Sequence, residues 1–586
     1  MKTTALDFRN VNALWCSVIA ETLVRCGVTR AVISPGSRST PLTMALVRHE
    51  EIEVVPVLDE RSAAFFALGL ARREDRPVVL VCTSGTAGAN YFPAVIEAEE
   101  SGAPLLVFTA DRPPEMRDCS SGQTIDQQKF YGAHVNFYHE LAVPEANAAM
   151  LRYARQMVAH AVGRTLTPQR GPVHLNAPFR DPLPPLPDGT EQRAAGLVTE
   201  DFFAHLSPSR TPVFAAPELP AWPANGVVIG GSRQGPGGAA YARAVGRIGR
   251  KLGWPVLADA LSPLRNRAAE VGPMVTHYDA LLRAQSVAAQ LRPEAVLVLE
   301  ALPTSKVLRE WLRSLDGVPL WFASERVVNR DAVHGAARSL EVSAETLAAA
   351  LPERAEAAES DYAGRWYEAN ARVATAIAAE VDREETLFEG KIARVLQQTL
   401  PEGTPLFVAN SMPVRDLEYF WAATDARIET FTSRGASGID GTLSTALGIA
   451  HGAERPAVLL TGDLAFLHDT NGLLLAAKLR GSLTVVLVNN GGGGIFGHLP
   501  VAQFDPPFEE YFATPQRVDF ARLVGAYGIV HAKVRDWAEL RQALEKLPAS
   551  GVRVLEVRTD RKADAARRKA LFVAAEAAAK GRSGPA

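Results

Sequence analysis

The sequence predicts an α/β protein built from three doubly wound parallel-sheet domains. A chain of 586 residues is too long for a single hydrophobic core. Short apolar runs alternate with segments of helical periodicity, which is typical of parallel sheets covered by helices. A proline-rich stretch at residues 181–187 interrupts this alternation, because proline fits poorly inside either element. We expect a first domain at 1–185, a linker at 186–224, a central domain at 225–345 and a third domain at 346–586.

The composition excludes several classes of protein. Hydrophobic residues make up 47% and charged residues 22% of the chain, as in ordinary folded proteins. A net charge of −3 gives no general reason to bind nucleic acid or an anionic membrane. The four cysteines form no CxxC pair, which argues against a zinc site and suits a reducing compartment. Residues 1–10 lack a signal-peptide core and no segment is long and apolar enough for a membrane span, so we expect a soluble cytoplasmic protein.

The first domain shows the alternation most clearly. An amphipathic helix is predicted over 11–26, and strands are predicted at 30–34, 54–58, 78–82 and 105–109. Because the strands are separated by helix-length segments, we expect them to run parallel in one sheet.

The central domain begins with the apolar run 226–231 and continues with predicted strands at 295–299 and 320–322. The glycines of 230–235 do not match G-x-G-x-x-G, which favours a tight turn over a dinucleotide loop. The Ala- and Glu-rich stretch 344–385 predicts helices that lead into the third domain. Residues 561–586 predict a terminal helix with a frayed end.

The third domain carries polar residues at the ends of two apolar runs, 457–460 and 483–486. Both runs predict buried parallel strands, and ligands of such sheets collect at the carboxyl edge. There Asp463 offers a carboxylate, Asn490 an amide oxygen and Gly492 a bare carbonyl. These hard oxygen donors suit Mg²⁺ and leave coordination positions for a diphosphate. The alternative is a common Gly-Asp turn and a common Asn-Asn-Gly loop.

The same residues and their spacing resemble the thiamin diphosphate signature, in which Asp, Asn and a glycine carbonyl hold Mg²⁺ or Mn²⁺ against the cofactor diphosphate. Glu60, between a strand and a long helix, resembles the glutamate that hydrogen-bonds N1′ of the aminopyrimidine in these enzymes. A carboxylate there favours the tautomer whose nitrogen can remove the C2 proton. Taken alone, Glu60 is equally explained as a carboxylate favoured at a helix start.

Further segments resemble one family, the 2-succinyl-5-enolpyruvyl-6-hydroxy-3-cyclohexene-1-carboxylate synthases (MenD) of menaquinone biosynthesis. These segments are 33–42, 83–87, 111–115, 122–127, 409–415, 433–441 and 493–496. The resemblance implies the thiamin-diphosphate decarboxylase fold and a transferase that decarboxylates 2-oxoglutarate and adds the succinyl unit to isochorismate. It also implies an active site shared between subunits, so we expect a homodimer, possibly a tetramer.

Both implied substrates are dicarboxylates, which guanidinium groups bind in bidentate fashion. Four arginines follow predicted strands, namely Arg38, Arg112, Arg415 and Arg434. Neutral donors stand in the same loops, namely Ser37, Gln123 and Ser411. Each arginine alone is explained as a solvated surface residue, whereas the set predicts a rim that binds carboxylates. The resemblance adds Phe496 and, in the central domain, Lys306 as substrate contacts.

The resemblance also implies a set of cofactor contacts: Glu60, Gly438, Ile439, Gly462, Asp463, Asn490, Gly492 and Ile495. We expect the side chain of Ile495 to wedge between the two cofactor rings and impose their bent conformation. The alternative is an ordinary core isoleucine.

Two other interpretations stay open from the sequence. A different member of the superfamily, such as an acetolactate synthase or a simple 2-oxoacid decarboxylase, would act on monocarboxylates and need fewer cations. A non-catalytic regulatory protein could keep the fold, although the joint presence of Glu60, Asp463 and Asn490 argues against it.

Overall fold

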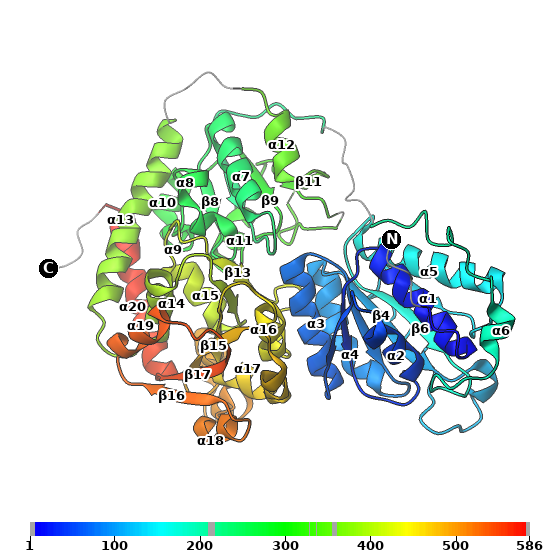
Figure 1. The fold of residues 1–586 in the computed structure, drawn as a ribbon. Helices are drawn as coiled ribbons and strands as arrows, with labels where there is room; N and C mark the ends of the chain where they lie inside the picture. The colour runs from blue at the N-terminus through cyan, green and yellow to red at the C-terminus, as the bar shows by residue number, and fades with distance from the viewer. Residues whose placement is uncertain (1–5, 209–216, 327, 336, 354–359, 582–586) are drawn as a thin grey trace. The chain divides into compact units, whose positions relative to one another are not determined.

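The computed structural model describes residues 6–208, 217–326, 328–335, 337–353 and 360–581. Within these ranges the chain forms three parallel sheets flanked by helices, so the predicted fold class is confirmed (Figure 1). The first sheet has the order β2-β1-β3-β4-β6-β5 and the third has the matching order β13-β12-β14-β15-β17-β16. Because the order recurs, loops that follow corresponding strands occupy corresponding places at the carboxyl edges of the two sheets.

The predicted strands lie close to β1, β2, β3, β4, β7, β9, β10, β14 and β15, and the other strands were not predicted. The first sheet contains β1 (Arg30–Ile33), β2 (Glu53–Pro56), β3 (Val78–Cys82), β4 (Leu105–Asp111), β5 (Phe137–Glu140) and β6 (Val173–Pro178). The central sheet, ordered β11-β10-β9-β7-β8, contains β7 (Gly226–Gly230), β8 (Val256–Ala258), β9 (Ala295–Leu299), β10 (Leu320–Ala323) and β11 (Ala337–Leu340). The third sheet contains β12 (Pro405–Val408), β13 (Glu429–Phe431), β14 (Ala457–Gly462), β15 (Ser482–Asn489), β16 (Val530–Val534) and β17 (Gly551–Arg558).

The helices connect these strands in chain order. The first part of the chain contains α1 (Val11–Arg25), α2 (Thr40–Arg48), α3 (Glu60–Glu74), α4 (Ala87–Ser101), α5 (Ala148–Leu166) and α6 (Thr190–Ala194). The middle contains α7 (Gly238–Leu252), α8 (Ala268–Val271), α9 (Tyr278–Arg283), α10 (Gln285–Gln290), α11 (Lys306–Arg313), α12 (Ala344–Ala350) and α13 (Asp361–Arg383). The last part contains α14 (Glu389–Thr399), α15 (Met412–Phe420), α16 (Thr442–Ala450), α17 (Asp463–His468), α18 (Phe520–Gly525), α19 (Trp537–Glu545) and α20 (Arg561–Ala579). Short 3₁₀ helices are η1 (Pro114–Met116), η2 (Pro263–Asn266), η3 (Thr470–Lys478), η4 (Gly494–His498) and η5 (Pro500–Gln503). The segment η6 (Glu509–Ala513) is a short π-helix.

Several sequence predictions can be compared directly with these elements. The segment 231–234 after β7 is irregular, and the turn lies at 236–237, just before α7, rather than within 230–235 as predicted. A Cβ at Gly231 would lie 1.9 Å from the carbonyl oxygen of Ala301. The predicted helical stretch 344–385 contains α12 and α13, and the predicted terminal helix is α20. Parts of the predicted N-terminal segment, linker, helical stretch and tail lie outside the described residues, namely 1–5, 209–216, 354–359 and 582–586.

The chain divides into two compact units. The first unit comprises Met1–Pro212, Ser433–His451 and His468–Leu479, and the second comprises Val213–Thr432, Gly452–Leu467 and Arg480–Ala586. In the first unit, α3 packs on α16 with glycines at the crossing. A Cβ at Gly69 would lie 2.1 Å from the carbonyl oxygen of Thr445, and one at Gly448 would lie 2.1 Å from that of Phe66. This close backbone contact holds α3, the helix that begins at Glu60, against α16.

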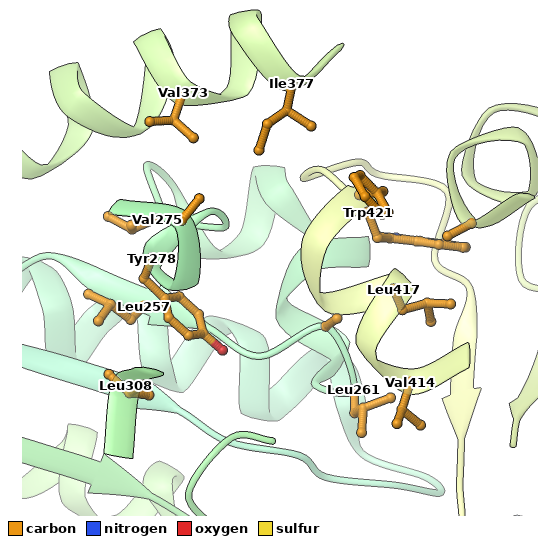
Figure 2. Close-up of a cluster of buried hydrophobic side chains, with 14 of the residues drawn as sticks. Leu257, Leu261, Val275, Tyr278, Leu308, Val373, Ile377, Val414, Leu417 and Trp421 are labelled. Atoms are coloured by element: carbon orange, nitrogen blue, oxygen red, sulfur yellow. The ribbon is translucent and has the colours of Figure 1, made fainter. Parts of the chain in front are cut away.

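In the second unit, one core joins the central and third sheets. Leu257 and Tyr278 from the central part and Val414, Leu417 and Trp421 from α15 belong to the same buried cluster (Figure 2). Buried apolar area of this extent is the main stabilising term for such a unit.

A buried arginine strengthens the same junction. The Nη1 atom of Arg265 donates to the carbonyl oxygen of Trp421 at 2.7 Å, and its Nη2 atom pairs with Glu418 at 2.7 Å. The helix α15, which carries Arg415, is therefore held by both apolar packing and charge.

In the part of the chain that the structure describes, none of the helices combines the length and the apolar character needed to cross a bilayer.

Candidate active site

The predicted metal residues meet at the carboxyl edge of the third sheet. The strands β14 and β15 are adjacent and parallel, with Gly462 in register with Val488. The Oδ2 atom of Asp463 accepts hydrogen bonds from the backbone N–H groups of Gly491 at 3.0 Å and Gly492 at 2.9 Å. The two loops predicted from sequence are therefore joined directly through this carboxylate.

The Asn490 side chain presents an unsatisfied oxygen. Its Oδ1 atom is buried and has no hydrogen-bond partner, which is costly unless a ligand completes the site. Its Nδ2 atom lies 3.4 and 3.5 Å from the carboxylate oxygens of Glu389. A hard cation bound by Asn490 Oδ1 would satisfy this atom, so the residues present fit a divalent metal.

The electrostatic surroundings of Asp463 also favour a bound cation. Burial raises the pKa of Asp463 to about 6, its backbone hydrogen bonds oppose the rise, and nearby Glu389 adds to it. A cation would favour the charged carboxylate. Among the described residues, no three His, Cys, Asp or Glu side chains gather to hold a metal, so any cation here depends on amide and carbonyl oxygens beside one carboxylate.

The backbone at Gly492 requires glycine. Its φ is +126°, and a Cβ there would lie 2.2 Å from the carbonyl oxygen of Ala513. Beyond it, Ile495 and Phe496 are half-buried in η4, and the Phe496 ring packs edge-on against Phe512 with centroids 6.0 Å apart. The conformation of this loop therefore depends on glycine at position 492 and on the aromatic packing of Phe496.

Glu60 begins α3 in the first unit. The preceding residue, Asp59, caps the helix by accepting a hydrogen bond from the Ser62 N–H at 2.8 Å and another from Asn471 Nδ2 at 2.7 Å. Burial raises the pKa of the Cys82 thiol, and the Glu60 charge adds to that rise. The carboxylate of Glu60 is therefore close enough to the carboxyl end of β3 to influence the Cys82 thiol electrostatically. The other predicted residues of this sheet lie at the same edge.

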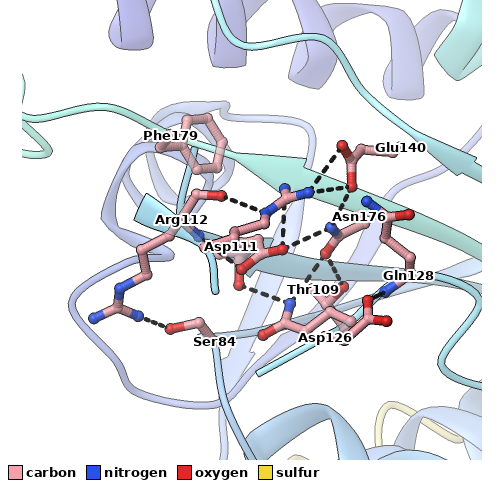
Figure 3. Close-up of polar contacts among 12 residues, drawn as sticks. Ser84, Thr109, Asp111, Arg112, Asp126, Gln128, Glu140, Asn176 and Phe179 are labelled. Atoms are coloured by element: carbon pink, nitrogen blue, oxygen red, sulfur yellow. Dashed lines mark hydrogen bonds and ion pairs between the residues drawn. The ribbon is translucent and has the colours of Figure 1, made fainter. Parts of the chain in front are cut away.

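Arg112 lies beside Ser84 (Figure 3), and Gln123 contacts both residues. The Arg112 guanidinium donates to Ser84 Oγ and, at 2.9 Å, to the Gln123 carbonyl oxygen, while Gln123 Nε2 donates to the Ser84 carbonyl oxygen at 2.9 Å. Arg38 donates to the carbonyl oxygen of Phe179 at 2.9 Å. Burial, and then the charge of Arg38, lower the pKa of Arg112. Arg38 also pairs with Asp181 at 3.5 Å, and the charges of Asp111 and Asp181 oppose the fall in the pKa of Arg112. The two neighbouring guanidinium groups still offer several donors to an anion.

A polar network that was not predicted as a site lies behind Arg112 (Figure 3). Asn176 Nδ2 donates to Asp111 Oδ2 at 2.9 Å, and Gln127 Nε2 donates to Asn176 Oδ1 at 3.0 Å. The Gln127 Oε1 atom accepts from the Gly85 N–H at 2.8 Å. The local signals were Asp111 at the end of a mostly apolar strand and Asn176 inside another strand.

The segment that carries Arg434 is held by a buried ion pair. Glu97, which is 3% exposed, accepts hydrogen bonds from the N–H groups of Gly435 at 3.0 Å and Ala436 at 2.7 Å. Arg72 pairs with Glu97. The predicted cofactor contacts Gly438 and Ile439 follow directly in the chain. Neither Glu97 nor Arg72 was predicted, because a helical ion pair has no sequence signal that points to a loop far along the chain.

In the second unit, Ser411 and Arg415 lie at the start of α15. The φ of Ser411 is +74°, a conformation that non-glycine residues rarely adopt outside functional sites. Its carbonyl oxygen accepts from Arg415 Nη1 at 2.5 Å. Burial lowers the pKa of Arg415, and among the described residues no carboxylate lies within 4.0 Å of its guanidinium. Such a desolvated cation favours an anionic ligand.

Two predicted substrate-binding residues, Lys306 and Ser37, are exposed and contact residues that are near them in the sequence. Lys306 begins α11, its side chain is 85% exposed, and it pairs with Glu310 at 3.4 Å. Ser37 is exposed in the turn before α2 and accepts a hydrogen bond from Thr40 Oγ1 at 2.7 Å through its carbonyl oxygen.

Comparison with known proteins identifies the class of this fold. The model of the thiamine pyrophosphate enzyme N-terminal binding domain matches residues 16–130, the middle domain matches 205–408, and the C-terminal binding domain matches 417–557. Solved structures share the fold: a 4-hydroxybenzoylformate decarboxylase from Rhodococcus jostii has a TM-score of 0.67 and 18% identity over 93% of this chain and 99% of its own. The benzoylformate decarboxylase of Polynucleobacter necessarius has a TM-score of 0.65 and 18% identity over 93% and 98%. The chain is therefore a thiamin diphosphate enzyme.

Relatives narrow the assignment further. The 2-succinyl-5-enolpyruvyl-6-hydroxy-3-cyclohexene-1-carboxylate synthase of Gloeothece citriformis is 50% identical over 568 residues, 96% of this chain and 97% of the relative. The synthase of Synechococcus elongatus is 50% identical over 97% of both chains, and that of Acaryochloris marina is 49% identical over 97% and 98%. This chain belongs to the 2-succinyl-5-enolpyruvyl-6-hydroxy-3-cyclohexene-1-carboxylate synthase family, which confirms the resemblance found in the sequence.

Proposed function

We propose that this enzyme uses thiamin diphosphate and Mg²⁺ to decarboxylate 2-oxoglutarate and to add the resulting succinyl unit to isochorismate. The product would be 2-succinyl-5-enolpyruvyl-6-hydroxy-3-cyclohexene-1-carboxylate, a precursor in menaquinone biosynthesis. The observation that carries the proposal is the loop in which Asp463 holds the backbone of Gly491 and Gly492 while the buried oxygen of Asn490 has no partner. Membership of the family supports the choice of reaction.

The proposed cofactor contacts fall into a cation set and a set against the organic part of the molecule. Asp463, Asn490 and the Gly492 carbonyl would bind the cation, with Gly462, Gly438, Ile439 and Ile495 against the rest of the molecule. When bound, thiamin diphosphate supplies a nucleophilic carbon that stabilises the electron pair released on loss of CO₂. Glu60 would hold a proton at N1′ of the aminopyrimidine and so favour removal of the proton at C2.

The arginines would bind the substrate carboxylates. Arg415 is half-buried, and among the described residues no carboxylate lies within 4.0 Å of its guanidinium. Arg112 is partly desolvated beside Arg38, and a bound carboxylate would stabilise both charges. Ser37, Gln123, Ser411, Arg434, Phe496 and Lys306 complete the proposed substrate contacts. This surplus of cations supports a dicarboxylate over the small monocarboxylates of other superfamily members.

The proposal extends to assembly, domains and compartment. A homodimer or tetramer would bring Glu60 of one subunit to the cation loop of another. We keep the domain limits proposed above, 1–185, 225–345 and 346–586, with a linker at 186–224. Buried free thiols at Cys16, Cys26 and Cys82 suit the reducing cytoplasm.

CO₂ release tests the proposal. The purified enzyme with thiamin diphosphate and Mg²⁺ is expected to release CO₂ from 2-oxoglutarate at a sustained rate only when isochorismate is present, and to leave pyruvate untouched. Steady turnover of pyruvate without isochorismate would instead indicate a simple 2-oxoacid decarboxylase.

A further inference from the structure

We propose that Glu389 is a positioning residue that orients the Asn490 side chain, so that Oδ1 rather than Nδ2 faces the bound cation. This inference rests on the proposed function, which places a divalent cation beside Asn490. Glu389 itself is not proposed to touch the cation, the cofactor or a substrate.

The contact between the two side chains fixes which end of the amide faces which way. The Asn490 Nδ2 atom lies 3.4 and 3.5 Å from the two oxygens of Glu389. An ionised carboxylate only accepts hydrogen bonds, so the NH₂ end of the amide must face it. The oxygen end then points away, and Asn490 Oδ1 is the buried atom that has no partner. The arrangement leaves that oxygen available to a cation.

Glu389 is itself held in place by buried charge. Arg568 Nη2 lies 3.5 Å from Glu389 Oε2 and 2.7 Å from Asp416 Oδ2. The side chains of Glu389, Asp416 and Arg568 are 4%, 3% and 1% exposed. Charges this deeply buried keep their places only when paired, so the cluster resists rotation of the Glu389 carboxylate. It also ties α14 and α20 to α15, the helix that carries Arg415.

Gly494 lies against the NH₂ end of the Asn490 amide, on the side that faces Glu389. A Cβ at Gly494 would lie 2.8 Å from Asn490 Nδ2 and 3.7 Å from Glu389 Oε1. The φ of Gly494 is not in the left-handed region, so an alanine there would be opposed by this contact and not by the backbone. The same space that admits the amide therefore excludes a methyl group.

The substitution Glu389→Gln should reverse the amide. Arg568 is a donor only, so it would take the carbonyl oxygen of the new glutamine and leave the NH₂ end facing Asn490. The Asn490 oxygen would then turn toward position 389 and away from the cation. Loss of an outer partner of a metal ligand commonly lowers metal affinity about 10- to 100-fold.

The test measures cation binding and not turnover. Full-length enzyme with saturating thiamin diphosphate is titrated with Mn²⁺, and free Mn²⁺ is followed by electron paramagnetic resonance. We expect Glu389→Gln to raise the Mn²⁺ dissociation constant about 10-fold or more. The matched control is Glu418→Gln, which breaks another buried pair, with Arg265 at 2.7 Å, and should leave Mn²⁺ affinity unchanged.

Three further variants keep the result decisive. Glu389→Asp keeps the charge beside Arg568 but shortens the side chain and withdraws the carboxylate from Asn490 Nδ2, so it should also weaken Mn²⁺ binding and decides the case if Glu389→Gln fails to fold. Gly494→Ala displaces the amide without touching the charged cluster, and weaker Mn²⁺ binding in this variant shows that the position of the amide governs cation affinity. Wild-type affinity in a folded Glu389→Gln variant, with Asn490→Ala impaired, would overturn the positioning role alone. Wild-type affinity in Asn490→Ala as well would overturn the proposed cation site.

Discussion

The carboxylate of Asp463, the first residue of α17, accepts a hydrogen bond at 2.9 Å from the backbone N–H of Gly492, which lies in the loop after β15. The bond aligns the end of β14 with the loop after β15. It places the one carboxylate of the proposed cation set against the backbone whose carbonyl oxygen is proposed as a second ligand. Asp463 therefore organises the loop, and under the proposed function it would also offer negative charge to the cation.

Asp463→Ala should remove both roles. The remaining ligands are neutral, and a strongly hydrated cation binds neutral oxygens weakly. We expect the thiamin diphosphate dissociation constant to rise about 10-fold or more and to depend on high Mg²⁺, as measured by fluorescence titration. Unchanged titration curves would place the cation elsewhere.

Gly492→Ala tests the shape of the same loop. An added methyl group meets the Ala513 carbonyl oxygen at 2.2 Å, and the φ of +126° is strained for any other residue. We expect weaker cofactor binding and a free energy of unfolding lower by about 1–3 kcal/mol in chemical denaturation. The control is Gly497→Ala, because nothing lies within 4 Å of that Cβ. Equal effects of the two variants would contradict the assignment.

Glu60→Gln keeps the size of the side chain and removes the charge proposed to hold a proton at N1′. We expect near-normal cofactor affinity and a kcat lower by about 10²-fold or more. Exchange of the cofactor C2 proton, followed by NMR, should slow in parallel. Glu51→Gln, at an exposed position, serves as the control, and full activity of Glu60→Gln would remove Glu60 from the mechanism.

Arg415→Ala and Arg112→Ala test the carboxylate rim. Truncating one partner of a desolvated charge pair costs about 2–5 kcal/mol, so kcat/KM toward at least one substrate should fall about 30-fold or more. Lysine should replace either arginine poorly, because it lacks the bidentate fork. Normal kinetics for both alanine variants with 2-oxoglutarate and isochorismate would favour a monocarboxylate substrate.

Glu97→Gln should loosen the segment that carries Arg434. Glu97 accepts from two backbone N–H groups and pairs with buried Arg72, which a neutral amide cannot balance. We expect a lower free energy of unfolding together with a raised KM for a substrate. Hydrogen exchange at Gly435 and Ala436 should speed up, and unchanged protection of these amides would contradict the contact.

The site residues that come directly after strands could be predicted from the sequence. Asp463 and Asn490 could be placed because apolar runs mark β14 and β15, and parallel strands end at one edge. Resemblance supplied Arg112 and Gln123, which the structure brings together at Ser84. Glu389 could not be predicted from the sequence. It stands 101 positions before Asn490, and it begins a helix, where a carboxylate is favoured without any functional role.

Other parts of the site depend on tertiary packing that leaves no local pattern. Glu97 lies on a helix whose acidic residues give no sign of which one is buried, and its partners are 338 and 339 positions away. Asn176 was visible only as a polar residue in an apolar strand. Such residues are recognised once the strands are assembled, because a buried polar group must then find its partner.

Mass spectrometry of the product tests the central claim most directly. The purified enzyme is incubated with thiamin diphosphate, Mg²⁺, 2-oxoglutarate and isochorismate. We expect a product that contains isochorismate plus the succinyl unit, with one CO₂ lost from 2-oxoglutarate and the enolpyruvyl group retained. Succinic semialdehyde as the only product, with isochorismate recovered unchanged, would contradict the proposed function.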